Sequence, residues 1–372
     1  AHDEVAGRGS EDKKQEEPAM KIFPVLLTAV LLTGCSGLPA AREMGDMALL
    51  RTLGVDRGAA GVEVTGSTGP QAKGLQAEGE SSLVLSADDD TLSAACLAMQ
   101  GQSDSFVFFG YVDQLLLGET LAEQGVTPVL DYAARNTELG LGARLWLIRD
   151  GSARDAIQAG GQEGIEKRLE TLRADGKMGI TSLTRTAGEV YTDLLERGCA
   201  FVPALSPAGD GTAQLTQRGY GVLKGDTLAG FLEGDEARGL ELLAGGPTGH
   251  ILTVGSTSVK TTSAHTKSRL EFQGEMPSLL RLTCRIEARL TEYDRRPQGE
   301  ELRALMTAAE EQERACIQRA LTRLQELEAD CAGLGAQAAM YCPAQWQRGQ
   351  GDWPRGFSQI PIEIEVQVAI QT

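Results

Sequence analysis

The sequence predicts an α+β protein of several domains, with mixed α/β architecture, antiparallel sheets and a C-terminal domain made of a β-meander, a long helix and a final strand. Two alternating segments support this prediction. Residues 280–290 and 360–370 carry an apolar side chain at every second position, as in strands with one buried and one solvated face. Between them, apolar residues recur with a 3.6-residue period over 300–332, which predicts an amphipathic helix of about nine turns.

Three domains are predicted from the order of these patterns. Residues 35–198 alternate short apolar strands with helices and predict an N-terminal α/β domain, which starts with a helix that Pro39 opens and that runs toward Leu50. A new strand begins at Cys199, and residues 199–248 are predicted as a small middle domain, with a hinge in the small-residue stretch 204–218. The C-terminal sheet and its long helix occupy 249–372.

The segment before these domains has a different composition. Residues 1–19 contain six acidic and three basic residues and almost no large apolar side chain, so they are predicted to be a disordered upstream extension. Met20 is the predicted initiator. Lys21 and the short apolar run 22–33 follow, and the run is shorter than the 20 or so residues that a membrane span needs. Residues 20–34 are therefore predicted to be a signal peptide.

The end of this run specifies the kind of signal. Leu32-Thr33-Gly34-Cys35 has the order of a bacterial lipobox, which predicts cleavage between Gly34 and Cys35 and lipidation of the Cys35 thiol. Two acyl chains hold a protein stably at a bilayer. The alternative is an ordinary secretory signal that happens to end near a cysteine.

The charge of the chain excludes some classes of partner. It carries 35 Lys and Arg against 52 Asp and Glu, a net charge of −17. Nucleic acids and anionic lipid surfaces require clustered basic residues, so we expect no nucleic-acid partner, and membrane attachment only through the lipid anchor.

No catalytic, cofactor or metal site is predicted, and the chain is predicted not to be an enzyme. There is no G-x-S-x-G nucleophile motif, and Gly140–Leu145 lacks the third glycine of a dinucleotide fingerprint. His250 and His265 have no carboxylate nearby in sequence, and the acidic run Asp88–Asp90 is better explained by the start of a helix. Carboxylates brought together from distant segments remain an open alternative.

The cysteines of the mature chain fit no zinc pattern. Cys96, Cys284 and Cys316 fall on apolar faces, which favours buried free thiols. Cys331 with Cys342 is the one pair for which a disulfide stays open, with the unbridged form favoured.

Several motifs resemble the Ger(x)C lipoproteins, the C subunits of nutrient germinant receptors in bacterial spores. After the lipobox come Arg42-Glu43-Met44-Gly45-Asp46-Met47-Ala48 and Leu53-Gly54-Val55-Asp56, similar to the family's R-E-L-x-D-x-A and G-[IV]-D. Further similar segments are 115–126, 130–136, 221–240 and the pair Trp346 and Trp353 with Phe357. The chain departs from the family at Leu223 and Thr227, and at Leu334-Gly335 and Met340-Tyr341, which precede Pro343. The resemblance spans residues 32–371.

This resemblance implies a lipid-tethered subunit on the outer face of the spore's inner membrane. Its implied partners are two integral-membrane subunits, A and B, and its implied role is receptor assembly and signal relay by protein contact. The alternative function is a lipoprotein that captures a small nutrient in a cleft between domains.

Overall fold

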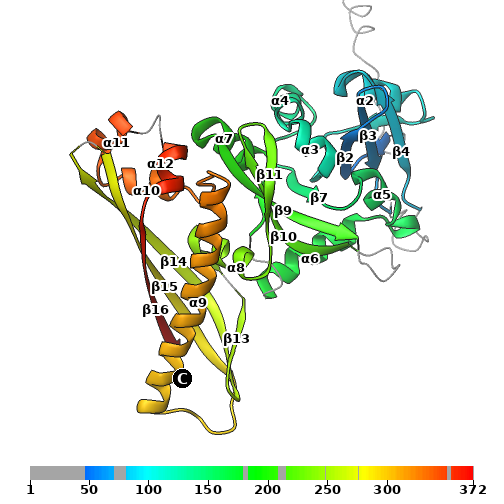
Figure 1. The fold of residues 1–372 in the computed structure, drawn as a ribbon. Coiled ribbons are helices and arrows are strands. Elements are labelled where there is room, and N and C mark those ends of the chain that lie inside the picture. Colours follow the sequence, from blue (N-terminus) through cyan, green and yellow to red (C-terminus); the bar gives the residue numbers. More distant parts are fainter. Residues whose placement is uncertain are drawn as a thin grey trace, which may run out of the picture. The chain divides into compact units, whose positions relative to one another are not determined.

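The computed structural model describes residues 47–70, 81–178, 183–207, 215–247, 249–274, 276–349 and 353–371. All of the described residues belong to one compact unit, Met47–Thr372 (Figure 1). The predicted upstream extension, the signal peptide, Cys35 and the helix start at Pro39 all lie outside the described residues. Where that helix was predicted to continue toward Leu50, the structure has a strand, β1 (Met47–Leu49).

A nine-stranded mixed sheet forms the larger part of this unit. Its centre is parallel, in the order β9-β7-β6-β2, with antiparallel strands added at both edges. The central strands are β2 (Thr52–Arg57), β6 (Gln114–Gly118), β7 (Arg144–Ile148) and β9 (Cys199–Pro207). The others are β3 (Val62–Ser67), β4 (Val84–Asp89), β8 (Arg185–Thr186), β10 (Leu215–Lys224) and β11 (Thr227–Leu232). β1 pairs with β5 (Phe106–Phe108) in a separate parallel pair.

Helices cover both faces of this sheet, which explains why its central strands read as continuous apolar runs. In β6, Leu115 and Leu117 belong to one core and the intervening Leu116 belongs to the other. The first core includes side chains of α2 (Leu92–Gln100), α3 (Glu119–Gln124), α4 (Thr127–Arg135) and α7 (Ala187–Arg197). The second includes side chains of α5 (Ala153–Gln158) and α6 (Glu166–Met178), which flank the short 3-10 helix η2 (Gly161–Glu163).

The segment 199–248 does not form the separate middle domain that was predicted. β9 pairs with β7, and β10 and β11 continue the same sheet, because eight of the nine residues of β9 are buried and need neighbours on both sides. The two ends of the predicted hinge, 204–218, are also strand residues that pair with each other: Leu205 of β9 lies opposite Gln217 of β10. Helix α8 (Gly234–Ala244) leaves this sheet and packs against the C-terminal helix α9 (Glu300–Glu326).

The C-terminal five-stranded sheet confirms the predicted fold class, with one difference in strand direction. β14 (Thr257–Gln273) and β15 (Met276–Glu292) form a long antiparallel ribbon, flanked by β12 (Gly246–Pro247) and β13 (Ile251–Val254). The last strand, β16 (Ile362–Gln371), pairs parallel to β15 and not antiparallel. The reason is the connection: α9 and three short helices form a long crossover, which parallel pairing requires. These helices are α10 (Leu334–Ala339), α11 (Pro343–Gly349) and α12 (Trp353–Gln359).

Helix α9 begins where it was predicted and ends six residues earlier. Leu327 is its C-cap, and Glu328 has a positive φ of 51°, which ends the helical path before residue 332. Gly239 of α8 lies at the closest approach to α9, where a Cβ atom would overlap the carbonyl oxygen of Cys316. The two helices therefore pack almost backbone to backbone.

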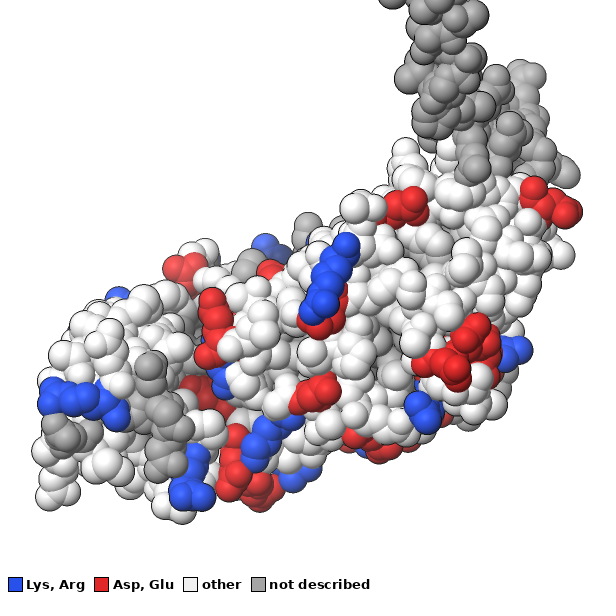
Figure 2. All heavy atoms as spheres, turned by 90° about the horizontal axis from the view of Figure 1, so that it is seen from above, with Lys and Arg blue, Asp and Glu red and all other residues white. Residues whose placement is uncertain are grey.

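Acidic and basic side chains are interspersed on the face shown in Figure 2, and much of that face is uncharged. Among the residues that the structure describes, no helix is long and apolar enough to cross a membrane.

Candidate functional site

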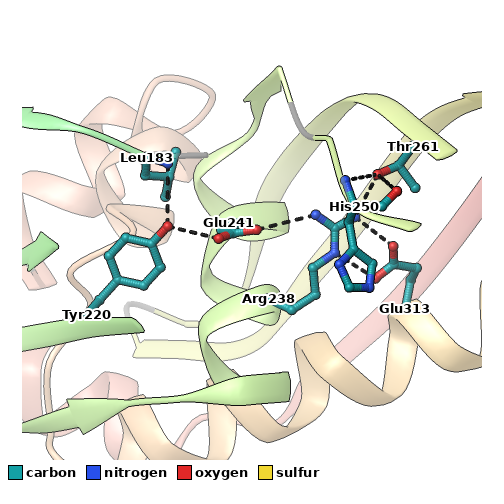
Figure 3. A network of polar contacts seen from close by, with 7 residues as sticks. All are labelled: Leu183, Tyr220, Arg238, Glu241, His250, Thr261 and Glu313. Atoms are coloured by element: carbon teal, nitrogen blue, oxygen red, sulfur yellow. Dashed lines mark hydrogen bonds and ion pairs between the residues drawn. The ribbon is translucent and has the colours of Figure 1, made fainter. Parts of the chain in front are cut away.

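A buried polar network lies where the nine-stranded sheet meets the C-terminal sheet (Figure 3). We call it the junction network and define it by six residues from five segments: Tyr220 of β10, Arg238 and Glu241 of α8, His250, Thr261 of β14 and Glu313 of α9. Four of these residues are buried, and Glu241 and His250 are partly buried, so the group differs from a solvated charge pair.

Arg238 and Glu313 form the centre of the junction network. Glu313 is 0% exposed and Arg238 5% exposed. The guanidinium donates from Nη2 to Glu313 Oε1 at 2.6 Å and from Nε to Oε2 at 3.1 Å, a two-pronged contact that fixes both planes. Nη2 also lies 3.2 Å from Thr261 Oγ1, and Nη1 lies 3.4 Å from Glu241 Oε2.

The charge of Arg238 is stabilised by these carboxylates. Burial by itself lowers the pKa of a guanidinium, but the hydrogen bonds to Glu313 and the negative charges of Glu313 and Glu241 outweigh it, so the pKa of Arg238 is raised. The Arg238 guanidinium therefore stays charged across the physiological pH range.

Glu241 extends the network to the nine-stranded sheet. Tyr220 Oη donates to Glu241 Oε1 at 2.9 Å and accepts a bond from the backbone N–H of Leu183 at 3.4 Å. The Tyr220 ring stacks edge-to-face on Phe201 of β9, with centroids 5.6 Å apart. One continuous set of contacts thus links β9 and β10 through α8 to β14 and α9.

His250 closes the network on the other side. Its backbone N–H lies 3.2 Å from Thr261 Oγ1, which in turn donates to the His250 carbonyl. Burial lowers the pKa of the His250 imidazole, and the positive charge of Arg238 lowers it further, against the raising effects of Glu313, Glu241 and Asp235. The sequence suggested no carboxylate partner for His250, because all of these groups are distant along the chain.

Glu313 is one of the residues of this site that sequence reasoning missed. It sits on the apolar stripe of α9 between Ala309 and Ile317, four residues from each. A carboxylate in the middle of a buried stripe signals a partner from another element, since an unpaired buried charge is very costly.

A second feature is a cavity of about 900 Å³ between the β9–β11 end of the large sheet and the helices that precede β16. We call it the aromatic cavity. Trp346 and Trp353 line it and meet edge-to-face at 5.2 Å, and Lys224 and Glu328 form an ion pair of 2.7 Å on its wall. An apolar surface with a few charged groups is the usual character of a small-molecule site.

Asp330 holds one wall of the aromatic cavity in place. Its buried carboxylate accepts bonds from the backbone N–H groups of Leu334 and Gly335, at 2.8 and 2.7 Å, and from Trp353 Nε1 at 2.9 Å. Burial raises the pKa of Asp330, and these three donors oppose the rise. The Trp353 ring lies directly on Gly335, where a Cβ atom would overlap it.

Two family models match this chain. The spore germination protein N-terminal domain matches residues 40–207, and the spore germination B3/GerAC-like C-terminal domain matches residues 218–372. The chain belongs to the GerAC family of spore germination proteins. The resemblance of its motifs to germinant-receptor C subunits is thereby confirmed.

Two relatives illustrate the range of this GerAC family. YfkR of Bacillus subtilis strain 168, whose name relates it to spore germination, is 28% identical over 221 residues, which are 55% of each chain. The present chain therefore spans about half the length of that relative. The crystal structure of the GerBC protein superimposes with a TM-score of 0.58 over 86% of this chain and 97% of the solved chain, at 17% identity, so the two share the fold.

The boundary between the two GerAC domain models falls inside the nine-stranded sheet. The first model ends at Pro207 in β9 and the second begins at Arg218 in β10, and these strands are hydrogen-bonded neighbours. The two family domains of this GerAC chain thus share one sheet.

The structure places the other residues considered from sequence as follows. Cys35, the predicted lipidation site, lies outside the described residues. His265 is exposed on β14, Asp88 accepts a bond from the backbone of Ala60, and the helix after Asp88–Asp90 is capped by Thr91. In the described part of the chain, no three His, Cys, Asp or Glu side chains gather closely enough to hold a metal ion.

The cysteines that the structure describes are free thiols, Cys331 and Cys342 included. Burial raises the pKa of Cys96 to about 11 and that of Cys199 to about 12. Cys331 is completely buried, which raises its pKa further. These thiols are therefore core side chains and poor nucleophiles.

Proposed function

We propose that this GerAC protein is the lipid-tethered subunit of a nutrient germinant receptor and acts in receptor assembly and germination signalling by protein contact. The observation that carries the proposal is the match of both family domains, over residues 40–207 and 218–372. The proposed partners are integral-membrane A and B subunits, and the proposed location is the outer face of the spore's inner membrane.

One side of the folded unit is suited to partner contact. Helices α2, α4, α7 and α10–α12 lie along the upper side in Figure 1, which Figure 2 views directly, and charged side chains are sparse there. Two of these helices, α2 and α7, expose the large apolar side chains Leu97 and Leu195, which are 74% and 68% accessible. Large apolar side chains that remain exposed beside uncharged surface favour burial against a partner.

The contact proposal is tested by co-purification with the membrane subunits. Leu97→Glu and Leu195→Glu place charges on α2 and α7, and we expect each to reduce recovery of the partners. Ile251→Glu is the matched control, because Ile251 is also an exposed apolar residue but belongs to the C-terminal sheet. Equal recovery with all three variants, at equal thermal stability, contradicts the assignment of this side.

The lipid tether rests on the Leu32-Thr33-Gly34-Cys35 motif. Cys35→Ala removes the thiol that would be acylated, so the protein should leave the membrane fraction after a high-salt wash. Cys342→Ala is the matched control, since it also removes one thiol, and the Cys342 thiol is partly accessible in the structure. A Cys35→Ala protein that sediments with membranes as fully as the control refutes the tether.

The aromatic cavity favours a second candidate function, capture of a small nutrient. Its volume of about 900 Å³ and its two tryptophans match a site for a small organic molecule. A saturable change in tryptophan fluorescence with a nutrient panel, lost in Trp346→Phe but kept in the core variant Trp146→Phe, supports capture. A flat titration across the panel removes this candidate and leaves the contact role.

A further inference from the structure

The exposed face of the C-terminal ribbon has a concentration of positive charge that the composition of the chain does not suggest. A groove of about 340 Å³ opens between β14 and β15. We call it the basic groove and define it by its lining, His265, Lys267, Arg269, Arg281, Thr283 and Arg285. No carboxylate lines it, although acidic residues outnumber basic ones by 52 to 35 in the chain.

Strand register brings these side chains together in three rows. Arg269 is opposite Arg281, Lys267 is opposite Thr283, and His265 is opposite Arg285. Neighbouring rows on one face are about 7 Å apart, and paired strands about 5 Å. Two arginines directly opposite each other destabilise a sheet, so folding alone does not favour this arrangement.

The arginines at the ends of the groove are held by their own contacts. Arg281 donates to Glu271 at 2.5 Å and forms an ion pair with Glu363 of β16. Arg285 bonds to Gln367, and the Arg269 guanidinium lies 5.6 Å from the centre of the Tyr341 ring. Their positions are therefore preorganised, while their outer N–H groups remain available to a ligand.

The middle row is different, because it lacks any partner of this kind. Among the residues that the structure describes, no carboxylate pairs with Lys267, and the hydroxyl of Thr283 has no hydrogen-bond partner. An ammonium and a hydroxyl thus face the groove between two rows of cations. This arrangement offers many donors. No carboxylate lines the groove itself, and Glu271 and Glu363, which lie beside it, are engaged by Arg281. Such a set of donors suits a multiply charged oxyanion.

We propose that the basic groove is a binding site for a phosphate group, with Lys267 as the central contact and the flanking guanidinium groups holding the outer oxygens. The small volume and the net charge of −17 favour a small soluble phosphate over an extended anionic surface, since the remainder of the chain repels such a surface. This proposal is independent of the receptor role.

Calorimetric titration of the full chain with inorganic phosphate, at an ionic strength held constant with chloride, tests the site. We expect saturable binding by the unaltered protein and about tenfold weaker binding by Lys267→Gln, because one charge-assisted hydrogen bond is removed. Lys260→Gln is the matched control: it makes the same change on the same strand, outside the groove, and should bind like the unaltered protein. Absence of saturable binding, or equal affinity of the two variants, overturns the proposal.

A second arm distinguishes the source of the phosphate group. The Cys35→Ala chain is sedimented with phosphatidylglycerol vesicles and with neutral phosphatidylcholine vesicles. We expect no excess binding to the anionic vesicles. The opposite outcome has two parts: the protein does not bind inorganic phosphate, and it binds anionic vesicles in excess, an excess that Lys267→Gln abolishes. This outcome overturns the assignment of a small soluble ligand and assigns the groove to lipid headgroups.

Discussion

Replacing Glu313 by Gln tests the role of the junction network most directly. The substitution keeps the volume of the side chain and one acceptor but removes the negative charge that faces Arg238. Loss of one partner from a buried ion pair costs about 3–5 kcal/mol, because the other charge stays buried without compensation. Arg238 retains Glu241 at 3.4 Å, so we take the lower end, about 3 kcal/mol.

This value converts into a measurable change in melting temperature. Unfolding entropy is about 2.1 cal/mol/K per residue, which gives about 0.7 kcal/mol/K for a unit of roughly 330 residues. Glu313→Gln should therefore lower the melting temperature by about 4 °C in a thermal unfolding assay. Glu311→Gln is the matched control, since Glu311 is exposed on the same helix, and we expect a change within about 1 °C.

A double variant separates the charge from the packing. Arg238→Met combined with Glu313→Leu removes both charges and fills the space with apolar groups, so it should recover most of the lost stability. Two results would refute this reasoning: a melting temperature of Glu313→Gln equal to that of Glu311→Gln, or a double variant that is less stable than Glu313→Gln. In either case the buried ion pair does not stabilise this junction.

Three further predictions follow from named contacts. Gly239→Ala should lower stability by about 1–3 kcal/mol in chemical denaturation, because the new Cβ meets the backbone of α9. Gly234→Ala is the control: its surroundings are open, and although its φ is positive we expect a smaller loss of stability than for Gly239→Ala. The pKa of His250 is lowered in the folded protein, so from about pH 6.5 downward the unfolded state binds more protons and the free energy of unfolding should fall as the pH drops. His250→Gln should make the free energy of unfolding depend less on pH in this range. His265→Gln, at an exposed position, should leave that dependence unchanged. In the native protein, an alkylating reagent should modify Cys342 before Cys199 and Cys331, as peptide mapping would show. After unfolding without reductant, full modification of Cys331 and Cys342 would show that these two residues form no disulfide.

The features predicted correctly from sequence are those that depend on local periodicity. The alternation in 280–290 and 360–370 identified β15 and β16, and the 3.6-residue period identified α9, because burial on one face leaves a repeat in the sequence. The direction of β16 leaves no such trace. An alternating strand has the same pattern whichever way its neighbour runs, and only the crossover through α9 decides the direction.

The junction network could not be predicted from the sequence, because it depends on contacts between distant segments. Its members come from residues 220 to 313, so no short window contains the pair Arg238 and Glu313. The middle domain predicted at 199–248 was wrong for a related reason: the apolar run of β9 indicates burial on both faces but not which strands provide it.

The shared sheet bears on whether the two family domains of a GerAC chain can move against each other. If the two family domains moved against each other, the motion would have to break the pairing of β9 with β10, in which Pro207, Ser206 and Leu205 are opposite residues 215–217. It would also have to separate Tyr220 of the second domain from two residues of the first, the backbone N–H of Leu183 and the ring of Phe201. We therefore expect the unit from Met47 to move as one body. Hydrogen exchange measures this rigidity. Peptides covering 199–207 and 215–224 should be protected as strongly as the β14–β15 ribbon. Fast exchange confined to the paired residues 204–207 and 215–218 would instead support the hinge predicted from the sequence.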